Sequence, residues 1–337
     1  MTQALAMGVS GGFMSIRLAC IVWKSLVRSI IEYGCEIWGD KQFKELDKLQ
    51  VAMGKRILRC GSRMSDVVVR GELGWERQKA RNDEMRLRYW GKIIRMGEDR
   101  VVNIIYRTSK ERLEREEAQK ANDPSVEISS TWCMYTRKLM IKLNLADEWR
   151  TERIPSEEDW NQLIRERIYE REQIKWRTEC LMKPKLRIYS LLKKELRQEP
   201  FLTVHHRSGI PELVKIRGGT NRLRIEQGRY KKEAVTERVC ESCEGKQIED
   251  ETHFMLTCVA YQNLREKMWT EFEEVTRTNR ESYICEIDQM NALIGDRFQP
   301  KESDEKDSHA WQSYKEIVKI VMIFITEAMN RRRGLQE

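Results

Sequence analysis

The sequence predicts a mainly α-helical fold with a small metal-binding module towards its carboxy-terminal end. Apolar side chains recur every three or four residues in several long segments, which is typical of amphipathic helices. Of the 337 residues, 34% are charged and 40% are hydrophobic, a balance that suits a helical protein with a sizeable core. Three of the nine cysteines and one of the four histidines fall between residues 240 and 258. A chain of this length has room for two or three modules.

Residues 1–108 are predicted to form a bundle of basic helices. Apolar stripes at helical spacing run through residues 15–38, 43–60 and 78–96, and the first of them is broken at Glu32-Tyr33-Gly34. The second of these segments presents apolar residues on one face and cations around the rest. Those cations are Lys48, Lys55, Arg56 and Arg59. The stripes indicate that the helices pack on one another, and the cations make the bundle surface basic.

Two further segments are predicted between the bundle and the metal-binding module. The charge run and turn sequence of residues 109–130 indicate a charged linker. Residues 131–200 regain helical spacing and are predicted to form a helical connector, with Ser156 as the N-cap of one helix. Four tryptophans are expected to anchor its core, because large aromatic side chains dominate core burial. They are Trp132, Trp149, Trp160 and Trp176.

Residues 201–282 contain the metal-binding pattern. Its ligands are Cys240, Cys243, His253 and Cys258, with the spacing C-x2-C-x9-H-x4-C and Gly245 placed to let the chain turn back. Three sulfurs and one imidazole nitrogen form the donor set that Zn²⁺ prefers in structural sites, with no ligand position left open for catalysis. The alternative is a group of ordinary buried thiols beside a surface histidine. The spacing favours a structural zinc site.

Residues 283–337 are predicted to form a polar linker followed by a helix over residues 311–329. The helix carries a strongly apolar face that needs cover, so it is expected to dock on another module or to bind a protein partner. After it come Arg331, Arg332 and Arg333, which could add phosphate contacts. A solvated, frayed end is the alternative.

The charge of the chain suggests an anionic partner. Its 62 basic and 54 acidic residues give a net charge of +8, with an isoelectric point near 8.9. Arginine clusters lie close to aromatic residues, a combination that suits phosphates and stacked bases. The alternative for each cluster is a solvated helix face. The candidate nucleic-acid contacts are Lys48, Lys55, Arg56, Arg59, Arg86, Arg88, Arg222, Arg224, Arg229 and Tyr230.

The location expected from the sequence is intracellular, either nuclear or cytoplasmic. Residues 1–12 lack the cationic start and the long apolar run of a secretion signal. Apolar stretches throughout the chain fall short of the roughly 18 to 20 residues that cross a bilayer, so no membrane association is expected.

Two blocks of the sequence resemble reverse transcriptases of LINE-type (non-LTR) retrotransposons. The run from Val22 to Gly39, with Glu32-Tyr33-Gly34 at its centre, is similar to the segment that opens the thumb in these enzymes, and residues 86–96 resemble a stretch that follows it. The pattern from Cys240 to Cys258, preceded by Gly228-Arg229-Tyr230, looks like their carboxy-terminal cysteine-histidine region. The resemblance covers roughly residues 15–108 and 186–270. It implies a thumb-like bundle, a connector and a zinc module that hold template RNA and target DNA.

The chain departs from this family in its catalytic residues. The family's chemistry depends on palm aspartates, usually an aromatic-x-Asp-Asp turn that binds two divalent ions, and the chain has no Asp-Asp pair. We therefore expect a non-catalytic, nucleic-acid-binding fragment or remnant rather than an enzyme. Two alternatives stay open: a zinc-stabilised helical module that makes protein contacts, or the carboxy-terminal part of an active RNA-directed DNA polymerase whose palm lies upstream of Met1.

Overall fold

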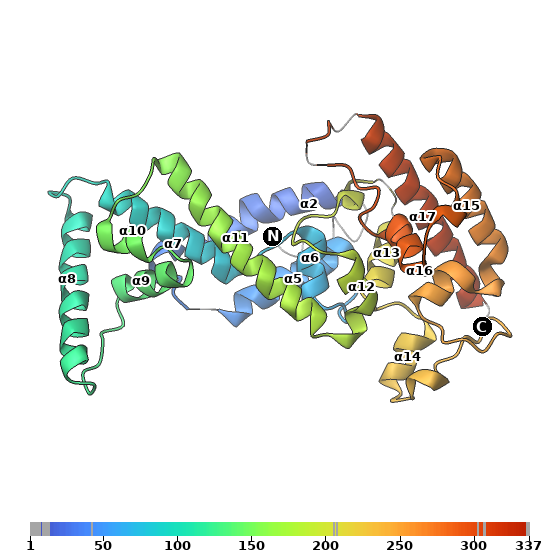
Figure 1. Cartoon of the computed structure of the whole chain (residues 1–337), viewed down its shortest axis with the longest axis horizontal. Helices are drawn as coiled ribbons and strands as arrows, with labels where there is room; N and C mark the ends of the chain where they lie inside the picture. The colour runs from blue at the N-terminus through green and yellow to red at the C-terminus, as the bar shows by residue number, and fades with distance from the viewer. Residues whose placement is uncertain are drawn as a thin grey trace. The chain divides into compact units, whose positions relative to one another are not determined.

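The structure, a computed structural model, describes residue 8 and residues 14–41, 43–204, 206, 208–301, 303–305 and 308–334. It is 70% helical, and the described residues contain no β-strand, which confirms the prediction of a mainly α fold (Figure 1). Apart from Gly8, the amino-terminal stretch in which no secretion signal was expected lies outside the described residues. Among the helices that are described, none combines the length and the apolar composition needed to span a membrane.

The chain folds into two compact units, and each is assembled from separate stretches of sequence. The central unit contains residues 24–50 and 76–175, and the carboxy-terminal unit contains residues 1–23, 51–75 and 176–337. This division differs from the five consecutive segments expected from the sequence. Composition along the chain reveals local changes in character, whereas a compact unit is defined by contacts between residues that are distant in sequence.

The central unit is built around a cluster of tryptophans. Trp90 lies with its ring centroid 5.9 Å from that of Trp149 and 5.5 Å from that of Trp160. The two polar atoms that this packing buries are satisfied, because Trp90 Nε1 donates to Tyr106 Oη at 3.1 Å and Trp160 Nε1 donates to the carbonyl of Leu87 at 3.2 Å. Trp149 and Trp160 thus anchor the core as predicted. The helices of this unit are α3 (Arg28–Ile31), α4 (Cys35–Trp38), α7 (Gln78–Ile94), α8 (Val101–Asn122), α9 (Trp132–Lys142), α10 (Ala146–Thr151) and most of α11 (Glu157–Leu181).

Helix α8 corrects the prediction of a charged linker at residues 109–130. The helix continues through residue 122, so the linker prediction is wrong for residues 109–122. Charged side chains in this run stabilise an exposed helix, as in the pair of Arg112 Nε and Glu116 Oε1 at 2.8 Å. Glu116 also accepts the backbone N–H of Ser129 at 2.7 Å, which ties the segment after the helix back to α8. That hydrogen bond, helped by Arg112, lowers the pKa of Glu116 to about 2.

Helix α11 begins where its cap was expected. Ser156 Oγ accepts the backbone N–H of Asp159 at 3.2 Å, and three acidic residues follow in the first turn. The segment 15–38 breaks at Gly34 as predicted, and it also contains a π-helical turn that was not predicted. Its parts are α2 (Ile16–Val22), a π-helical turn (Trp23–Val27), α3 and α4, and the left-handed Gly34 (φ 68°) separates α3 from α4.

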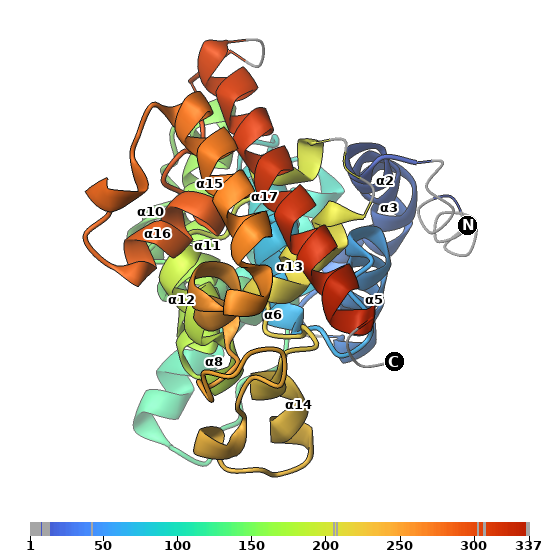
Figure 2. The same cartoon turned by 90° about the vertical axis from the view of Figure 1, so that its right-hand side faces the viewer.

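The carboxy-terminal unit is organised around α17 (His309–Gly334), which packs against α13 (Gly209–Arg217), α15 (Gln262–Thr276) and α16 (Glu286–Ile294) (Figure 2). Its apolar face, including Ile317, Val321 and Phe324, is buried by these helices. The predicted docking of the last helix therefore occurs within the chain, and a partner protein could reach only its outer side. The other helices here are α2, the end of α5 (Lys44–Leu58), α6 (Asp66–Leu73), α12 (Arg187–Leu192) and α14 (Arg224–Tyr230).

Candidate functional site

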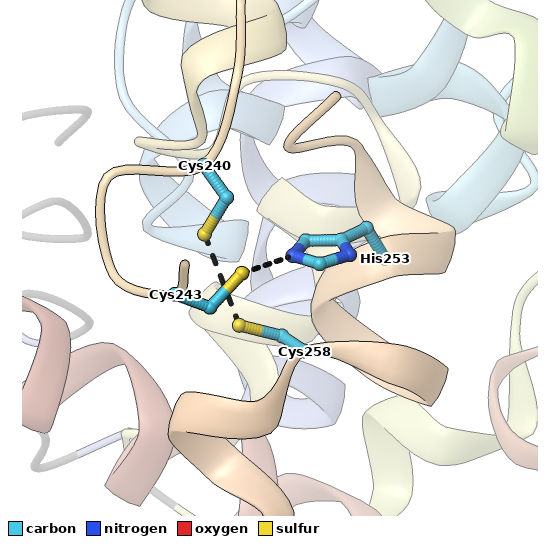
Figure 3. Close-up of side chains that lie close together, drawn as sticks. All are labelled: Cys240, Cys243, His253 and Cys258. Atoms are coloured by element: carbon cyan, nitrogen blue, oxygen red, sulfur yellow. Dashed lines mark hydrogen bonds between the residues drawn. The ribbon is translucent and has the colours of Figure 1, made fainter. Parts of the chain in front are cut away.

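The four predicted metal ligands converge on one point in the carboxy-terminal unit (Figure 3). Their ligand atoms all lie within 4.8 Å of one another. Cys240 Sγ is 3.8 Å from Cys258 Sγ, and Cys243 Sγ is 3.5 Å from His253 Nε2. A tetrahedral ion with Zn–S near 2.3 Å and Zn–N near 2.05 Å separates two sulfurs by about 3.8 Å and a sulfur from a nitrogen by about 3.5 Å. These two separations match a tetrahedral site, and the cluster of four ligand atoms could hold a metal ion.

A short hairpin carries the first two ligands. Val239 and Ile248 form an antiparallel bridge, and the Cys240 N–H donates to the carbonyl of Gln247 at 2.8 Å. The left-handed residue of the turn is Lys246 (φ 47°), one position after Gly245, which was expected to let the chain turn back. The hairpin brings the sulfurs of Cys240 and Cys243 to the same side. We call residues 239–248 the metal hairpin.

A π-helical turn, His253–Thr257, carries the other two ligands. Its wide geometry brings the Cys258 N–H to the carbonyl of His253 at 2.8 Å, so that the two side chains face the same point. At the start of the turn, the His253 N–H donates to a carboxylate oxygen of Asp250 at 2.8 Å. Because π-turns are rare and frequent at functional sites, this local distortion fits a ligand-presenting role.

The orientation of His253 is controlled by its second ring nitrogen. Nδ1 lies 2.9 Å from Gln247 Oε1 and 3.1 Å from Thr257 Oγ1. A proton on Nδ1 that is donated to the Gln247 carbonyl oxygen leaves the lone pair of Nε2 directed towards the sulfurs. Such partners behind a ligand histidine are the usual means of fixing its tautomer in a metal site.

Two buried arginines attach the site to the helices behind it. Arg265 of α15 donates to the carbonyls of Met255 at 3.0 Å and of Cys258 at 2.7 Å. Arg332 of α17 binds both carboxylate oxygens of Glu249 at 3.0 and 2.6 Å. Arg332 is 2% exposed, which corrects the expectation of a phosphate contact at this residue, whereas Arg331 and Arg333 are exposed. The metal cluster is therefore anchored on α15 and α17.

The thiols of Cys240 and Cys258 lie in hydrogen-bond contact, with 3.8 Å between their sulfurs. Their contact, together with burial, raises the pKa of Cys240 to about 12, and the same contact lowers the pKa of Cys258. A divalent cation would replace the thiol protons, because thiolates rather than thiols bind metals. Four protein ligands fill a tetrahedral shell, so the ion would stabilise the fold and leave no position for a substrate.

A second group of predicted residues comes together around Tyr230, whose side chain is 52% exposed. The guanidinium carbons of Arg63 and Arg229 lie 4.9 and 4.7 Å from its ring centroid. Lys185 Nζ donates to the carbonyl of Arg63 at 3.3 Å, and Lys55 Nζ donates to that of Ser62 at 3.1 Å. We call Lys55, Arg63, Lys185, Arg229 and Tyr230 the Tyr230 cluster.

Like charges crowd together in the Tyr230 cluster. Burial lowers the pKa of Lys185, and the charges of Arg229, Lys183 and Lys55 lower it further. Two carboxylates offset part of this charge, since Glu226 pairs with Arg229 at 2.8 Å and Asp66 pairs with Lys55 at 2.9 Å. The cations still outnumber the acids, and that excess attracts anions.

The sequence analysis missed Arg63 and Lys185. Neither residue lies on a helical stripe, since Arg63 is in the turn after α5 and Lys185 is in a short 3₁₀ segment, Pro184–Leu186. The only feature of the sequence that could have pointed to these two residues is its general abundance of basic residues. Only the fold brings the turn after α5, the 3₁₀ segment and the end of α14 to one place.

The structure corrects two of the predicted nucleic-acid contacts. Arg86 is 1% exposed and donates to the carbonyl of Ile37 at 3.2 Å, and burial lowers its pKa. Arg224 is 9% exposed and pairs with Glu233 at 2.8 Å and Glu241 at 3.2 Å. Both guanidinium groups are largely buried and have partners within the protein, because basic residues near aromatic residues also serve as packing and pairing groups. Neither can reach a phosphate in this fold.

The remaining predicted contacts are divided between the two units. Lys48 and Arg88 belong to the central unit, where Arg88 pairs with Glu84, and therefore stand outside the Tyr230 cluster. Arg56, Arg59 and Arg222 belong to the carboxy-terminal unit, with Arg56 and Arg222 exposed.

A comparison of the chain with protein-family models, curated proteins and solved structures finds no match in any of the three.

Proposed function

We propose that this chain binds nucleic acid through the Tyr230 cluster, without catalysing a reaction, and that zinc is the ion that stabilises its metal cluster. The observation that carries the proposal is that two arginines from separate segments lie against one exposed aromatic ring, while two lysines bind the backbone of the turn that carries one of those arginines. Repulsion between neighbouring cations destabilises the folded state. Such a grouping therefore does not serve folding, which favours a role in binding.

The composition of the cluster suits a polynucleotide strand. Arginine and lysine contact phosphates irrespective of sequence, and the release of counterions makes such binding salt-dependent. Aromatic rings and guanidinium planes both stack on bases. Tyr230 and its two arginines therefore offer stacking surfaces beside phosphate contacts. The role agrees with the resemblance to the thumb and the carboxy-terminal region of LINE-type reverse transcriptases, which implies contacts with template RNA and target DNA.

Zinc is supported by the donor set of the metal cluster. Three sulfurs and one imidazole nitrogen at tetrahedral separations favour Zn²⁺ over Mg²⁺ or Ca²⁺, which take oxygen ligands. Zinc content of the purified chain tests this directly, with one ion per chain expected. Substitution by Co²⁺ should give the visible absorption of a tetrahedral thiolate complex. Substoichiometric zinc after purification from zinc-supplemented cells would contradict the proposal.

Binding is tested by fluorescence anisotropy with labelled single-stranded RNA, single-stranded DNA and duplex DNA at several salt concentrations. Tyr230→Ala should weaken single-strand binding by about 1–3 kcal/mol, or roughly 5- to 150-fold, if the ring stacks on a base. Tyr230→Phe retains a ring and should bind nearly normally. The double variant Arg63→Ala/Arg229→Ala should also reduce the salt slope for a single strand by about 1.4, since each lost phosphate contact removes about 0.7.

Arg150→Ala serves as the matched control, because this arginine is highly exposed in the central unit and pairs with an acidic neighbour, Asp147, much as Arg229 pairs with Glu226. It should leave both affinity and salt slope unchanged. The nucleic-acid proposal is abandoned if the wild type binds none of the three probes at low salt, or if Arg150→Ala weakens binding as much as the cluster variants do.

A further inference from the structure

A second set of cations surrounds an open pocket of about 810 Å³ in the carboxy-terminal unit. Its lining includes Trp311, Lys315 and Lys319 from the first half of α17. Helix α14 lies nearer the other end of α17 (Figure 2). The cations are contributed by α2, the loop after α12, the loop before α17 and α17 itself. They are Arg17, Arg197, Lys301, Lys315 and Lys319, and Trp311 stands among them.

The acidic residues at this pocket do not neutralise it. Glu199 is 1% exposed, and its carboxylate is already bound by Lys193 and lies 3.4 Å from Arg217 Nη2. Asp304 accepts the backbone N–H of Lys301 at 2.8 Å. Two of the cations also have an acidic neighbour outside the pocket lining, since Arg197 Nε lies 3.3 Å from Glu195 Oε2 and Lys319 Nζ lies 3.7 Å from Glu316 Oε2. The five cations still exceed the available carboxylates, so the pocket attracts anions.

The cationic side chains stand on well-anchored elements. Lys315 and Lys319 are one turn apart on α17, whose opposite face is buried in the unit core. Arg17 lies in the first turn of α2, which packs against the 3₁₀ segment Pro200–Thr203 and is capped by Ser15. Lys315 Nζ is 5.9 Å from the ring centroid of Trp311. Anchored cations around a concave site lose less entropy on binding than mobile surface lysines do.

We propose that this pocket binds a compact polyphosphate, with the chemistry shared by free tripolyphosphate and the triphosphate of a nucleotide, as a function separate from the Tyr230 cluster. Its volume is within the range of small-ligand sites, about 300–1,000 Å³. Lysine and arginine from four segments can contact several oxygens of one phosphate chain at once. Trp311 adds a ring beside the cations that can contact a base.

Isothermal titration calorimetry on the full chain, with tripolyphosphate as the first probe, tests the proposal. Saturable binding with one site per chain is expected, weakened at least about tenfold in Lys315→Ala/Lys319→Ala. The control Lys138→Ala/Lys142→Ala removes two exposed lysines with the same spacing on α9 and should bind normally. Arg63→Ala/Arg229→Ala should also bind tripolyphosphate normally, so this test is independent of the nucleic-acid proposal.

Further probes distinguish the sources of the phosphate. ATP that binds more tightly than tripolyphosphate, with the difference lost in Trp311→Ala, supports a nucleotide as ligand, whereas equal affinities support the phosphate chain alone. Three results overturn the proposal: no heat of binding with tripolyphosphate, equal binding by wild type and Lys315→Ala/Lys319→Ala, or displacement of tripolyphosphate by a short oligonucleotide that binds more tightly at the same lysines. Circular dichroism confirms that each variant is folded.

Discussion

The metal hairpin and the core of the central unit are held together by different means. In the central unit, Trp90 and Trp160 are fully buried and their ring nitrogens are hydrogen-bonded, so apolar burial alone can support the fold. In the metal hairpin, residues 244–247 are all exposed, and the first two ligands rest on one backbone bridge. So short a hairpin is marginally stable in water. We therefore predict that the hairpin depends on a bound ion for its fold, whereas the central unit does not.

The two halves of the metal cluster show the same difference, because the π-helical turn is largely buried whereas the hairpin is more exposed. Phe254 and Met255, which follow His253, are fully buried, and the ring of Phe254 packs against Tyr261 and Phe324. The π-helical turn is thus part of the unit core before any ion binds. We infer that ligands His253 and Cys258 are prearranged, and that the ion recruits the hairpin to them.

The largest effect is expected from Cys240→Ser/Cys243→Ser. Structural zinc contributes about 10–16 kcal/mol of apparent binding free energy in small modules, and this variant should lose the ion together with the fold of the metal hairpin. Hydrogen exchange should accelerate in residues 239–248 while the helices of the central unit keep their protection. Cys285→Ser, at an exposed cysteine, is the matched control and should retain the metal. Protection of the hairpin in the double variant would contradict its dependence on metal.

The converse test removes the tryptophan at the centre of the other core. Trp90→Ala should destabilise the central unit by about 3–5 kcal/mol, because it leaves a large cavity. Metal content should stay at the wild-type value, because the ligands belong to the carboxy-terminal unit. Urea unfolding followed by circular dichroism, with metal content measured in parallel, checks both points. A variant that loses its metal along with central-unit stability would show that the two regions are coupled.

A smaller effect is expected where the metal site is anchored to α17. Arg332→Met leaves Glu249 buried without its cation, and removal of one partner from a buried pair costs about 3–5 kcal/mol. We expect the lower end of this range, because Glu249 still accepts the backbone N–H of Arg224 at 2.7 Å. Thermal unfolding measures the loss. Arg333→Met, at a partly exposed arginine, should change stability little. Glu249→Gln combined with Arg332→Met should recover part of the stability that Arg332→Met loses.

The smallest effect concerns pH in the central unit. The pKa of Glu116 is lowered from 4.5 to about 2, so its bond to the Ser129 N–H is fully formed above pH 4.5 and is lost as the pH falls through about 2. The exchange rate of the Ser129 amide, measured by NMR and corrected for intrinsic exchange, should rise in that window. Glu116→Gln should make the corrected exchange rate of the Ser129 amide nearly independent of pH. The metal ligands take up protons on acidification as well, so metal release should be followed in the same titration.

The sequence predicted the helices better than it predicted the boundaries between units. The cap at Ser156 and the break at Gly34 depend on neighbouring residues and were identified correctly. The linker prediction failed at residues 109–122 because a charge run is equally compatible with a solvated helix. The predicted boundaries differ from those of the two units, because segments such as residues 51–75 belong to the same unit as residues more than a hundred positions away.

By itself the sequence determined the helical class of the protein and the four residues of a cluster that could hold a metal ion. Periodicity and ligand spacing are properties of short segments, and they survive in any fold that contains those segments. Only the tertiary structure decided which cations are available to a ligand. It buries Arg86 and joins Arg332 to Glu249, 83 residues away, while it gathers Arg63, Lys185 and Arg229 around Tyr230. The physical reason is that burial and charge pairing depend on contacts between distant residues, which no local pattern encodes.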